Sequence, residues 1–296
     1  PPWYNFKKLI VEVALMKSLI KKFIFAFQII AFLFVSCMPL QSVNADSSKK
    51  NFILVLDPGH GCTQSGATRT YDGVEIKECD LNLKIAYYLK NFLERYETSD
   101  GRKVKVYLTH NDDLTSPLVL SERVKKGTSL NAEAIISLHN NTTGTDKSFS
   151  GAMVLVTHSH YKPKNCRFED LYKIEKHLGA SILSSLKDIG IEHAHLADES
   201  TRTDEVPICP NYIYKNGFLR RLSDDGSTYK NGDTTDWYGI VYHGIRLGIP
   251  SIIVEHVYLD NPDDYYKYLS SDEKLCKLAK ADARGIINYY GLVKCK

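Results

Sequence analysis

Two histidines of the sequence stand where a metal ion could be bound. His60 lies in the segment LDPGHG and follows the short apolar run Phe52–Leu56. His139 lies in SLHNN and follows a second such run, Ala134–Leu138. Short apolar runs are typical of buried strands, and ligands of α/β sheets tend to bind beyond the carboxyl ends of the strands. One histidine in a turn is more often a plain surface residue, but two in the same setting predict a metal site at one sheet edge.

Zinc suits a site of this kind, because it takes imidazole and carboxylate ligands and, in catalytic sites, commonly keeps a fourth position open. The third ligand should then be acidic. Glu75 and Glu78 both precede a helical pattern that starts near Asp80. A helix dipole favours a carboxylate at a helix start without any metal, which accounts for one of the two but not necessarily both. The residues alone leave the choice between them open.

A further carboxylate, Glu255, directly follows the apolar run Ser251–Val254 in the segment IPSIIVEH. A buried carboxylate costs free energy unless it is paired or solvated, so this residue either lies at a solvated strand end or has a task. At the same sheet edge as the two histidines, it could act as a general base that accepts a proton from water.

The elements that must position these residues alternate between strand-like and helix-like patterns from Asn51 onward. Expected strands are Phe52–Leu56, Lys103–Thr109, Ala134–Leu138, Gly151–Thr157, Tyr212–Leu222 and Ser251–Val254. Expected helices are Asp80–Tyr96, Ser121–Thr128, Leu171–Leu186, Asp236–Leu247 and Asp272–Tyr290. This order predicts the α/β class, with a single layered domain, a largely parallel or mixed central sheet flanked by helices, and the zinc site at the carboxyl edge of the strands.

The chain divides into a leader and one catalytic domain. Residues 16–45 combine the cationic stretch MKSLIKK, an apolar run and the small residues SVNA, which predicts a signal peptide and an exported protein, extracellular or cell-wall associated. A retained membrane anchor and lipidation at Cys37 are alternatives. Residues 1–15 lack a Met and are expected to be an upstream or non-native segment. Residues 50–292 form the expected domain, with 191–235 as an irregular insertion of the kind that is often functional.

Charge and cysteine content bound the function further. Of the 38 basic and 35 acidic residues, five and one lie within residues 1–45, so the remainder holds 33 against 34. This balance argues against a nucleic-acid-binding protein, which needs a clustered basic excess. Six cysteines of the body permit disulfides in an exported protein, and closeness in sequence favours Cys276 with Cys295 and Cys166 with Cys209. The alternative is free, buried thiols.

Four motifs resemble those of a known family. The segment from about Asn51 to Gly291 resembles the zinc-dependent N-acetylmuramoyl-L-alanine amidases, the type 3 family of peptidoglycan hydrolases. LVLDPGHG is similar to its first zinc motif, ECDLNLKIA to its acidic motif, ISLHNN to its second histidine motif, and IPSIIVEHVYLDN to the segment of its catalytic acid. The resemblance implies a Zn²⁺ cofactor with the ligands His60, Glu78 and His139, and it implies that Glu255 is catalytic.

The implied substrate is peptidoglycan, cleaved at the amide between the lactyl group of N-acetylmuramic acid and the L-alanine of the stem peptide. A zinc peptidase acting on stem peptides and a catalytically silent wall-binding module are alternatives, as is a thiol hydrolase using Cys62 or Cys79. The sequence departs from the family at Cys79, where Lys is usual, at His110, where Arg is frequent, and at His256, where small residues are common. It identifies no regulatory partner and gives no strong indication of an oligomer.

Overall fold

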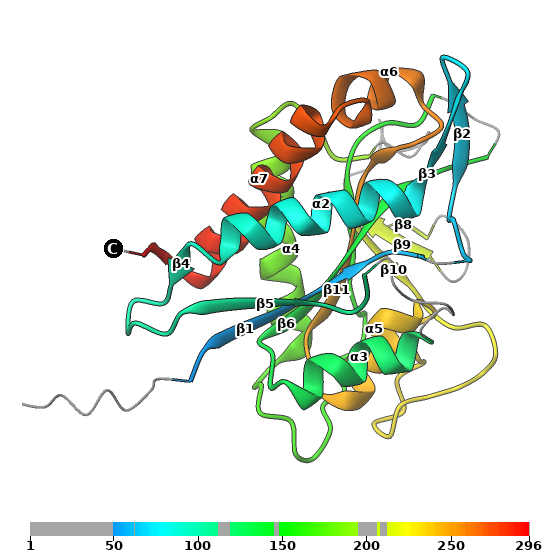
Figure 1. Ribbon diagram of the computed structural model, residues 1–296. Helices are drawn as coiled ribbons and strands as arrows, with labels where there is room; N and C mark the ends of the chain where they lie inside the picture. Colours follow the sequence, from blue (N-terminus) through cyan, green and yellow to red (C-terminus); the bar gives the residue numbers. More distant parts are fainter. Residues whose placement is uncertain are drawn as a thin grey trace, which may run out of the picture. The chain divides into compact units, whose positions relative to one another are not determined.

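The strands that carry the histidine and glutamate motifs lie side by side in the computed structural model. The structure describes residues 50–61, 63–111, 119–144, 148–194, 206–207 and 212–295. Neighbouring parallel pairs join, in this order, β5 (Val104–Leu108), β1 (Phe52–Pro58), β6 (Ala134–Asn141) and β11 (Ser251–Tyr258). Parallel strands bring their carboxyl ends to a common edge. The residues that follow the apolar runs of β1, β6 and β11 therefore meet there (Figure 1).

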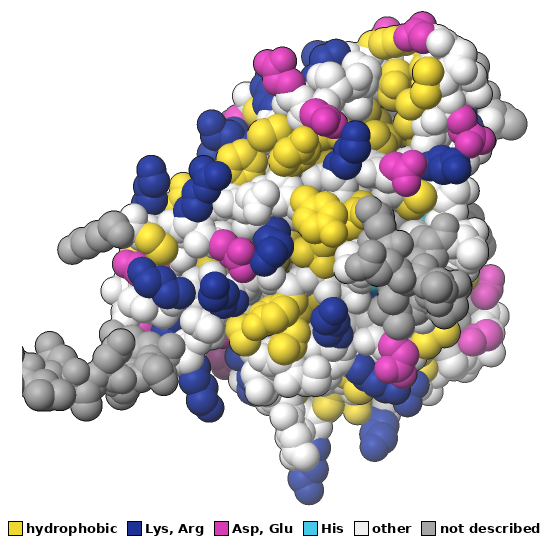
Figure 2. Space-filling view, viewed as in Figure 1, with side chains coloured by type: hydrophobic (Ala, Val, Ile, Leu, Met, Phe, Trp, Pro, Cys, Tyr) yellow, Lys and Arg dark blue, Asp and Glu magenta, His cyan; other side chains and the backbone are white. Residues whose placement is uncertain are grey.

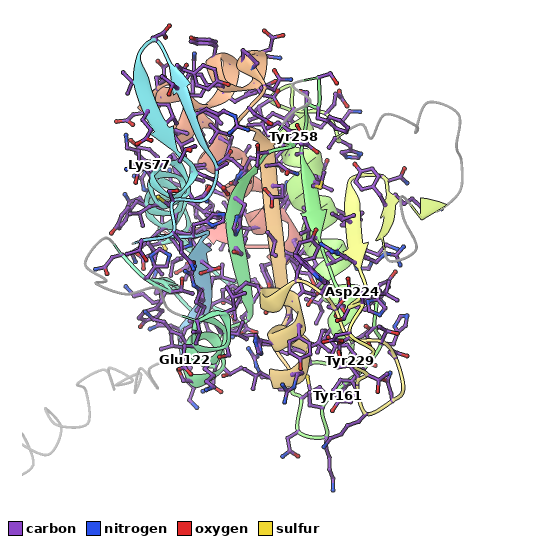
Figure 3. All side chains as sticks on the ribbon, turned by 90° about the vertical axis from the view of Figure 1, so that its right-hand side faces the viewer. Lys77, Glu122, Tyr161, Asp224, Tyr229 and Tyr258 are labelled. Atoms are coloured by element: carbon purple, nitrogen blue, oxygen red, sulfur yellow. The ribbon has the colours of Figure 1, made fainter. Side chains whose placement is uncertain are left out.

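The other half of the sheet runs in mixed directions. β11 pairs antiparallel with β7 (Met153–Leu155), which pairs parallel with β10 (Phe218–Arg221). β9 (Tyr212–Lys215) and β8 (Val206–Pro207) complete it as antiparallel neighbours. Within the described ranges the sheet has eight strands in the order β5-β1-β6-β11-β7-β10-β9-β8. Figure 3 shows β11 between β6 and β7. The mixed central sheet expected from the sequence is confirmed.

Helices cover both faces of this sheet (Figure 1). Successive side chains of a strand point to opposite faces, so Leu54 and Leu56 join one core cluster and Val55 joins the other. The first cluster includes side chains of α2 (Glu78–Leu93), α4 (Leu171–Lys187) and α7 (Asp272–Tyr290). The second includes side chains of α3 (Leu120–Ser129) and α5 (Gly239–Leu247). The two buried faces fix the sheet between two helical layers.

Smaller elements join these layers. β2 (Thr68–Tyr71) and β3 (Val74–Lys77) form a hairpin directly before α2, and β4 (Tyr96–Glu97) pairs with β12 (Val293–Lys294). After β11 the chain forms α6 (Pro262–Asp264) and the π-helix η2 (Tyr265–Leu269). The β2–β3 hairpin is tied to this region because the Tyr71 hydroxyl donates to the carbonyl of Leu259, and the Tyr71 ring stacks on Tyr265 at 3.9 Å.

The boundaries of the expected strands differ from the structure in one informative way. β6 and β11 continue beyond their apolar runs, so His139 and Glu255 lie inside strands rather than after them. Backbone pairing between the two strands does not depend on apolar side chains, and it continues past the run that the sequence pattern detects. α2 begins earlier than expected, at Glu78, and α5 begins later, at Gly239.

The described part of the 191–235 region is less irregular than the sequence predicts. Tyr212–Leu222, expected as a single strand, contains the β9–β10 hairpin with Asn216 and Gly217 at its turn. Both residues have positive φ, 50° and 82°, which matches the two-residue hairpin turn that favours Asn-Gly. This hairpin extends the central sheet beyond β7.

The predicted leader lies outside the described residues, which all belong to the unit Lys50–Lys296. The expected signal peptide 16–45, the segment 1–15 and Cys37 therefore stay predictions. Among the described residues, none of the helices combines the length and apolar character needed to cross a bilayer. Basic and acidic side chains are interspersed on the face shown in Figure 2, in keeping with the near-neutral charge of the body.

The expected disulfide between Cys276 and Cys295 is wrong, since both are free thiols. Cys276 lies near the start of α7, whereas Cys295 follows the end of that helix. A helix rises about 1.5 Å per residue, so nearness in sequence becomes a separation of roughly 20 Å along the helix axis. A disulfide needs Cα atoms within about 7 Å of each other. Cys166 is also free, and its expected partner Cys209 lies outside the described residues.

Candidate metal centre and active site

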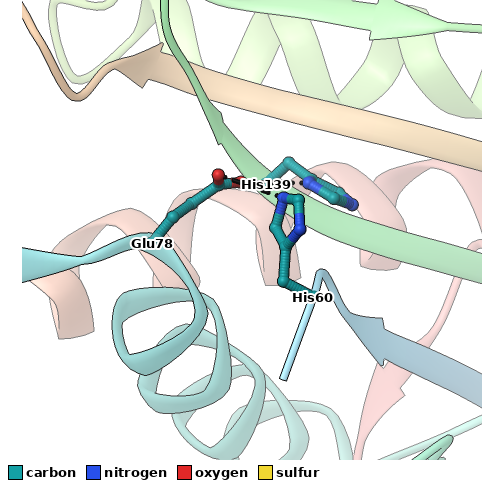
Figure 4. Close-up of side chains that lie close together, drawn as sticks. All are labelled: His60, Glu78 and His139. Carbon is teal, nitrogen blue, oxygen red and sulfur yellow. Dashed lines mark hydrogen bonds and ion pairs between the residues drawn. The ribbon is translucent and has the colours of Figure 1, made fainter. Parts of the chain in front are cut away.

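His60, Glu78 and His139 converge at the carboxyl edge of the parallel strands (Figure 4). Nε2 of His60 lies 3.1 Å from Oε2 of Glu78, and Nδ1 of His139 lies 3.0 Å from Oε1. One ligand atom from each residue lies within 4.8 Å of the other two. The two imidazole rings are 4.9 Å apart and nearly perpendicular, at 75°. The sequence prediction that these side chains meet is therefore matched by their placement.

This donor set fits a zinc ion. Tetrahedral zinc with bonds of about 2.0–2.2 Å holds its ligand atoms roughly 3.3–3.5 Å apart, close to the two nitrogen–oxygen distances here. Two imidazoles and one carboxylate are ligands that zinc accepts. Burial alone would raise the pKa of Glu78, but hydrogen bonds from His139 and His60 outweigh it and leave the pKa lowered. The carboxyl group is therefore in the ionised form that a metal requires.

Donors from three segments fix the Glu78 carboxylate. The backbone N–H of Ala67 donates to Oε2 at 2.9 Å, and the backbone N–H of Asn140 donates to Oε1 at 3.2 Å. The amide of Asn82 also donates to Oε1 and to the carbonyl of Gly59. Asn82 was not singled out by the sequence analysis, although its spacing of four from Glu78 puts both on one helix face. These contacts hold the carboxylate towards the histidines.

Glu75, the other acidic candidate from the sequence, occupies a different setting. Its side chain is 62% exposed on β3 and pairs with Lys77 at 3.5 Å. Glu78, in contrast, is buried at the first residue of α2, with 5% of its side chain exposed. The structure therefore brings Glu78, and not Glu75, to the two histidines.

The loop after β1 approaches the site in a backbone conformation that few side chains favour. His60 has φ of 64°, in the left-handed region, which is uncommon for a residue other than glycine. A Cβ atom at Gly59 would lie 2.3 Å from the His139 ring. The close passage of the loop backbone over His139 therefore requires glycine at position 59.

Glu255 lies beside His139 on the neighbouring strand. The two residues are register partners of β11 and β6, so their side chains emerge on the same face, about 5 Å apart at the backbone. Its Oε2 is buried and accepts no hydrogen bond from the described residues. Burial raises the pKa of Glu255 to about 7, against the opposing positive charge of His139. A carboxyl group with this pKa can both accept and release a proton near neutral pH.

A buried ion pair under the site was not foreseen from the sequence. Nη1 of Arg123 donates to Asp57 at 3.0 Å, and Nη2 donates to the backbone carbonyl of His60 at 2.7 Å. Asp57 also accepts from Thr109 and Ser137, each at 2.6 Å. Arg123 thus links α3 to the end of β1 and to the backbone of His60. An amphipathic helix pattern does not reveal which of its polar residues turns inward, so no sequence signal could have identified Arg123.

A pocket of about 550 Å³ opens next to the histidines. Its walls combine His60 and His139 with apolar and aromatic side chains from the starts of α3 and α5. The walls include Val119, Leu120, Trp237, Tyr238 and Ile240. Trp237 is 45% exposed, and the guanidinium of Arg221 lies 3.5 Å from the centre of its ring. The pocket is of a size that suits part of a small organic substrate, and it leads to the candidate metal centre.

Residues 54–288 match a protein family described as N-acetylmuramoyl-L-alanine amidase. The chain belongs to this amidase family. A curated member, the N-acetylmuramoyl-L-alanine amidase AmiC of Escherichia coli O6:H1, is 26% identical over 223 residues, which cover 73% of this chain and 47% of AmiC. The chain therefore spans about half the length of the curated amidase that it matches.

Solved structures of other amidases share the fold. The N-acetylmuramyl-L-alanine amidase Ami1 of Mycobacterium smegmatis superposes with a TM-score of 0.54 at 20% identity, covering 82% of this chain and 98% of Ami1. The amidase AmiC2 of Nostoc punctiforme gives a TM-score of 0.51 at 24% identity, covering 80% of this chain and 96% of that chain. At these identities the likeness supports the fold, and the fold class predicted from the sequence is confirmed.

Three residues at which the chain departs from the usual amidase motifs lie around the candidate metal centre. The His110 imidazole is buried and donates to the carbonyl of Pro58 at 2.7 Å. Burial and the charge of Asp80 raise the pKa of the Cys79 thiol to about 11. A thiol with this pKa is protonated at neutral pH, which argues against Cys79 as a nucleophile. His256 lies on β11 and its side chain is fully buried.

Proposed function

We propose that the protein is a zinc-dependent peptidoglycan hydrolase that cleaves the amide between N-acetylmuramic acid and the L-alanine of the stem peptide. The observation that carries the proposal is the convergence of His60, Glu78 and His139 beside Glu255, in a chain of the amidase family. AmiC, the curated relative, is by its name an enzyme of this specificity. His60, Glu78 and His139 would hold the metal ion.

The chemistry follows from the positions of the side chains. When bound, Zn²⁺ would polarise the scissile carbonyl and lower the pKa of a water from about 15.7 toward about 7. Glu255 would accept the proton of the attacking water and return it to the leaving amine. Its position beside His139 and its pKa of about 7 suit both transfers. Glu78 would stay fixed, because the backbone N–H groups of Ala67 and Asn140 donate to its carboxylate.

The pocket beside the histidines would bind the substrate next to the metal. Its aromatic and apolar walls at Trp237, Tyr238 and Leu120 suit the rings and methyl groups of a muramyl peptide. The amide to be cut would then lie at the end of the pocket where His60 and His139 are exposed. We also propose that the protein acts outside the cytoplasm, because its substrate is found there and residues 16–45 have the layout of a signal peptide.

The test is digestion of purified peptidoglycan by the zinc-loaded protein, followed by mass spectrometry of the released fragments. We expect free stem peptides that begin with L-alanine and glycan strands with free lactyl groups. Glu255→Gln should retain zinc but lower kcat by about 10²–10⁴-fold, the usual contribution of general acid–base catalysis. Fragments cut within the stem peptide would identify a peptidase, and binding of peptidoglycan without release of peptides would identify a wall-binding module. Either result would refute the proposal.

A further inference from the structure

His256 makes two polar contacts in the core, and one of them reaches a candidate zinc ligand. Its Nδ1 lies 2.8 Å from the backbone carbonyl oxygen of His139. Its Nε2 lies 2.9 Å from Oδ2 of Asp282, which comes from α7. The side chains of His256 and Asp282 are 0% and 1% exposed. The pair therefore joins α7 to the backbone of His139 without any contact with solvent.

The chemistry of the two partners fixes the state of the ring. A backbone carbonyl and a carboxylate both accept hydrogen bonds, so both ring nitrogens of His256 donate and the ring is an imidazolium. Asp282 is its counter-ion. Oδ1 of Asp282 is buried and accepts no hydrogen bond from the described residues, so His256 is the group that compensates this charge. The bond to His139 is consequently a charge-assisted one.

The bond lies at a break in the sheet ladder. Glu255 pairs with His139 and Tyr258 pairs with Asn141, so the register between β11 and β6 shifts between these pairs. A bulge of this kind interrupts the ladder and re-aims neighbouring side chains. His256 lies within the bulge, and its ring bridges the two strands where the register shifts. The bridge is thus placed to set the position of Glu255 relative to His139.

Packing alone gives a weak reason for such a pair. A buried ion pair seldom adds stability compared with apolar side chains of similar volume. Leu278 and Ile286, one helical turn before and after Asp282 on α7, are apolar and fully buried. Apolar side chains at positions 256 and 282 would therefore suit this environment. The ring contacts Asp282 of α7, on the sheet face opposite to the one that carries Ile253, which lines the pocket. His256 therefore cannot touch a substrate in that pocket.

We propose that His256, held by Asp282, is a positioning residue that fixes the backbone of His139 and so sets the geometry of the metal centre. This inference rests on the proposed zinc site. The bond from Nδ1 to the His139 carbonyl carries the effect, and Asp282 keeps the ring oriented for it.

Two double variants with side chains of similar shape test the inference, because one keeps a donor for the His139 carbonyl and the other has none. His256→Asn with Asp282→Ala removes the charged pair but keeps an amide nitrogen near the position of Nδ1, where it can donate to His139. His256→Leu with Asp282→Ala has a side chain of the same branching and no donor. We expect the Asn variant to bind zinc within about threefold of the unchanged protein. The Leu variant should bind zinc about 10-fold to 100-fold more weakly, as is typical when a hydrogen-bond partner of a metal ligand is lost.

Zinc affinity is measured by competition with a chromophoric chelator, and thermal unfolding of the metal-free variants is measured beside it. Leu278→Ala is the control for lost stability, because it removes a buried side chain of α7 but leaves the His256 pair intact. If the Leu variant does not fold, His256→Gln replaces it. Its amide nitrogen reaches the position of Nε2, donates to Asp282 and leaves the His139 carbonyl without this donor, so the same loss of zinc affinity is expected.

Equal zinc affinity of the Asn and Leu variants would overturn the inference. The inference would also be overturned if Leu278→Ala and the His256→Leu double variant lowered the melting temperature equally and lost equal zinc affinity. Failure of the unchanged protein to bind zinc, or unchanged binding after Glu78→Ala, would instead refute the proposed metal centre. The two failures are therefore distinguishable.

Discussion

Replacement of Arg123 by alanine should destabilise the protein strongly. The side chains of Arg123 and Asp57 are 4% and 1% exposed, and they meet at 3.0 Å. Removal of the guanidinium leaves the Asp57 carboxylate buried, with the hydroxyls of Thr109 and Ser137 as its remaining side-chain partners among the described residues. Loss of one partner of a buried ion pair costs about 3–5 kcal/mol. In a domain of this size each kcal/mol lowers the melting temperature by about 2–4 °C, so we expect a fall of roughly 6–20 °C.

The assay is urea and thermal unfolding of the metal-free protein, which separates folding from zinc binding. A matched control exists on the same helix, where Lys125 and Glu122 form an ion pair of 2.7 Å with side chains 57% and 49% exposed. Exposed pairs contribute about 0–1 kcal/mol, so Lys125→Ala should change stability little. If Arg123→Ala costs no more stability than Lys125→Ala, the buried pair does not stabilise the end of β1.

Three further substitutions test other parts of the site. Glu78→Ala should abolish zinc binding whereas Glu75→Ala should leave it intact, as metal analysis after dialysis would show; equal loss in both would contradict the ligand assignment. Gly59→Ala places a Cβ 2.3 Å from the His139 ring and should weaken zinc binding, measured by chelator competition, with the fold retained in circular dichroism. Burial raises the pKa of Glu175 well above its ordinary value. Its ionisation therefore opposes folding, and stability should fall as pH rises from about 4.3 toward the raised pKa. Urea unfolding across this pH range should show a smaller fall in the free energy of unfolding for Glu175→Gln than for the unchanged protein. An equal dependence of this free energy on pH in both proteins would exclude the effect.

The parallel half of the fold was predictable because its inner strands β1 and β6 are apolar on both faces. β1 and β6 carry continuous apolar runs that no exposed segment would tolerate, and the motifs with His60 and His139 follow them directly. The β2–β3 hairpin was missed for the opposite reason. Its residues are largely exposed, and the hairpin depends on its tie to Leu259, which lies far away in the sequence.

The part of the candidate site that depends on individual strands was predictable from the sequence. The placement of both histidines at one edge follows from parallel strands, but the choice of Glu78 depends on which carboxylate the turn into α2 buries. The inward turn of Arg123 and the contact of His256 with α7 depend on packing between elements distant in sequence. Local patterns contain no information on such contacts, and for this reason the contacts of both residues emerged only from the structure.

The position of β11 bears on how the chain can reach its folded state. Among the strands of the central sheet, β11 is the last in sequence, yet it lies between β6 and β7. Until it is in place, both of those strands have an unpaired edge, the kind of surface that other chains can pair with. Pairing over long sequence separations is also slow. The two halves of the sheet, and with them Glu255, are therefore joined late, after nearly the whole chain has been synthesised.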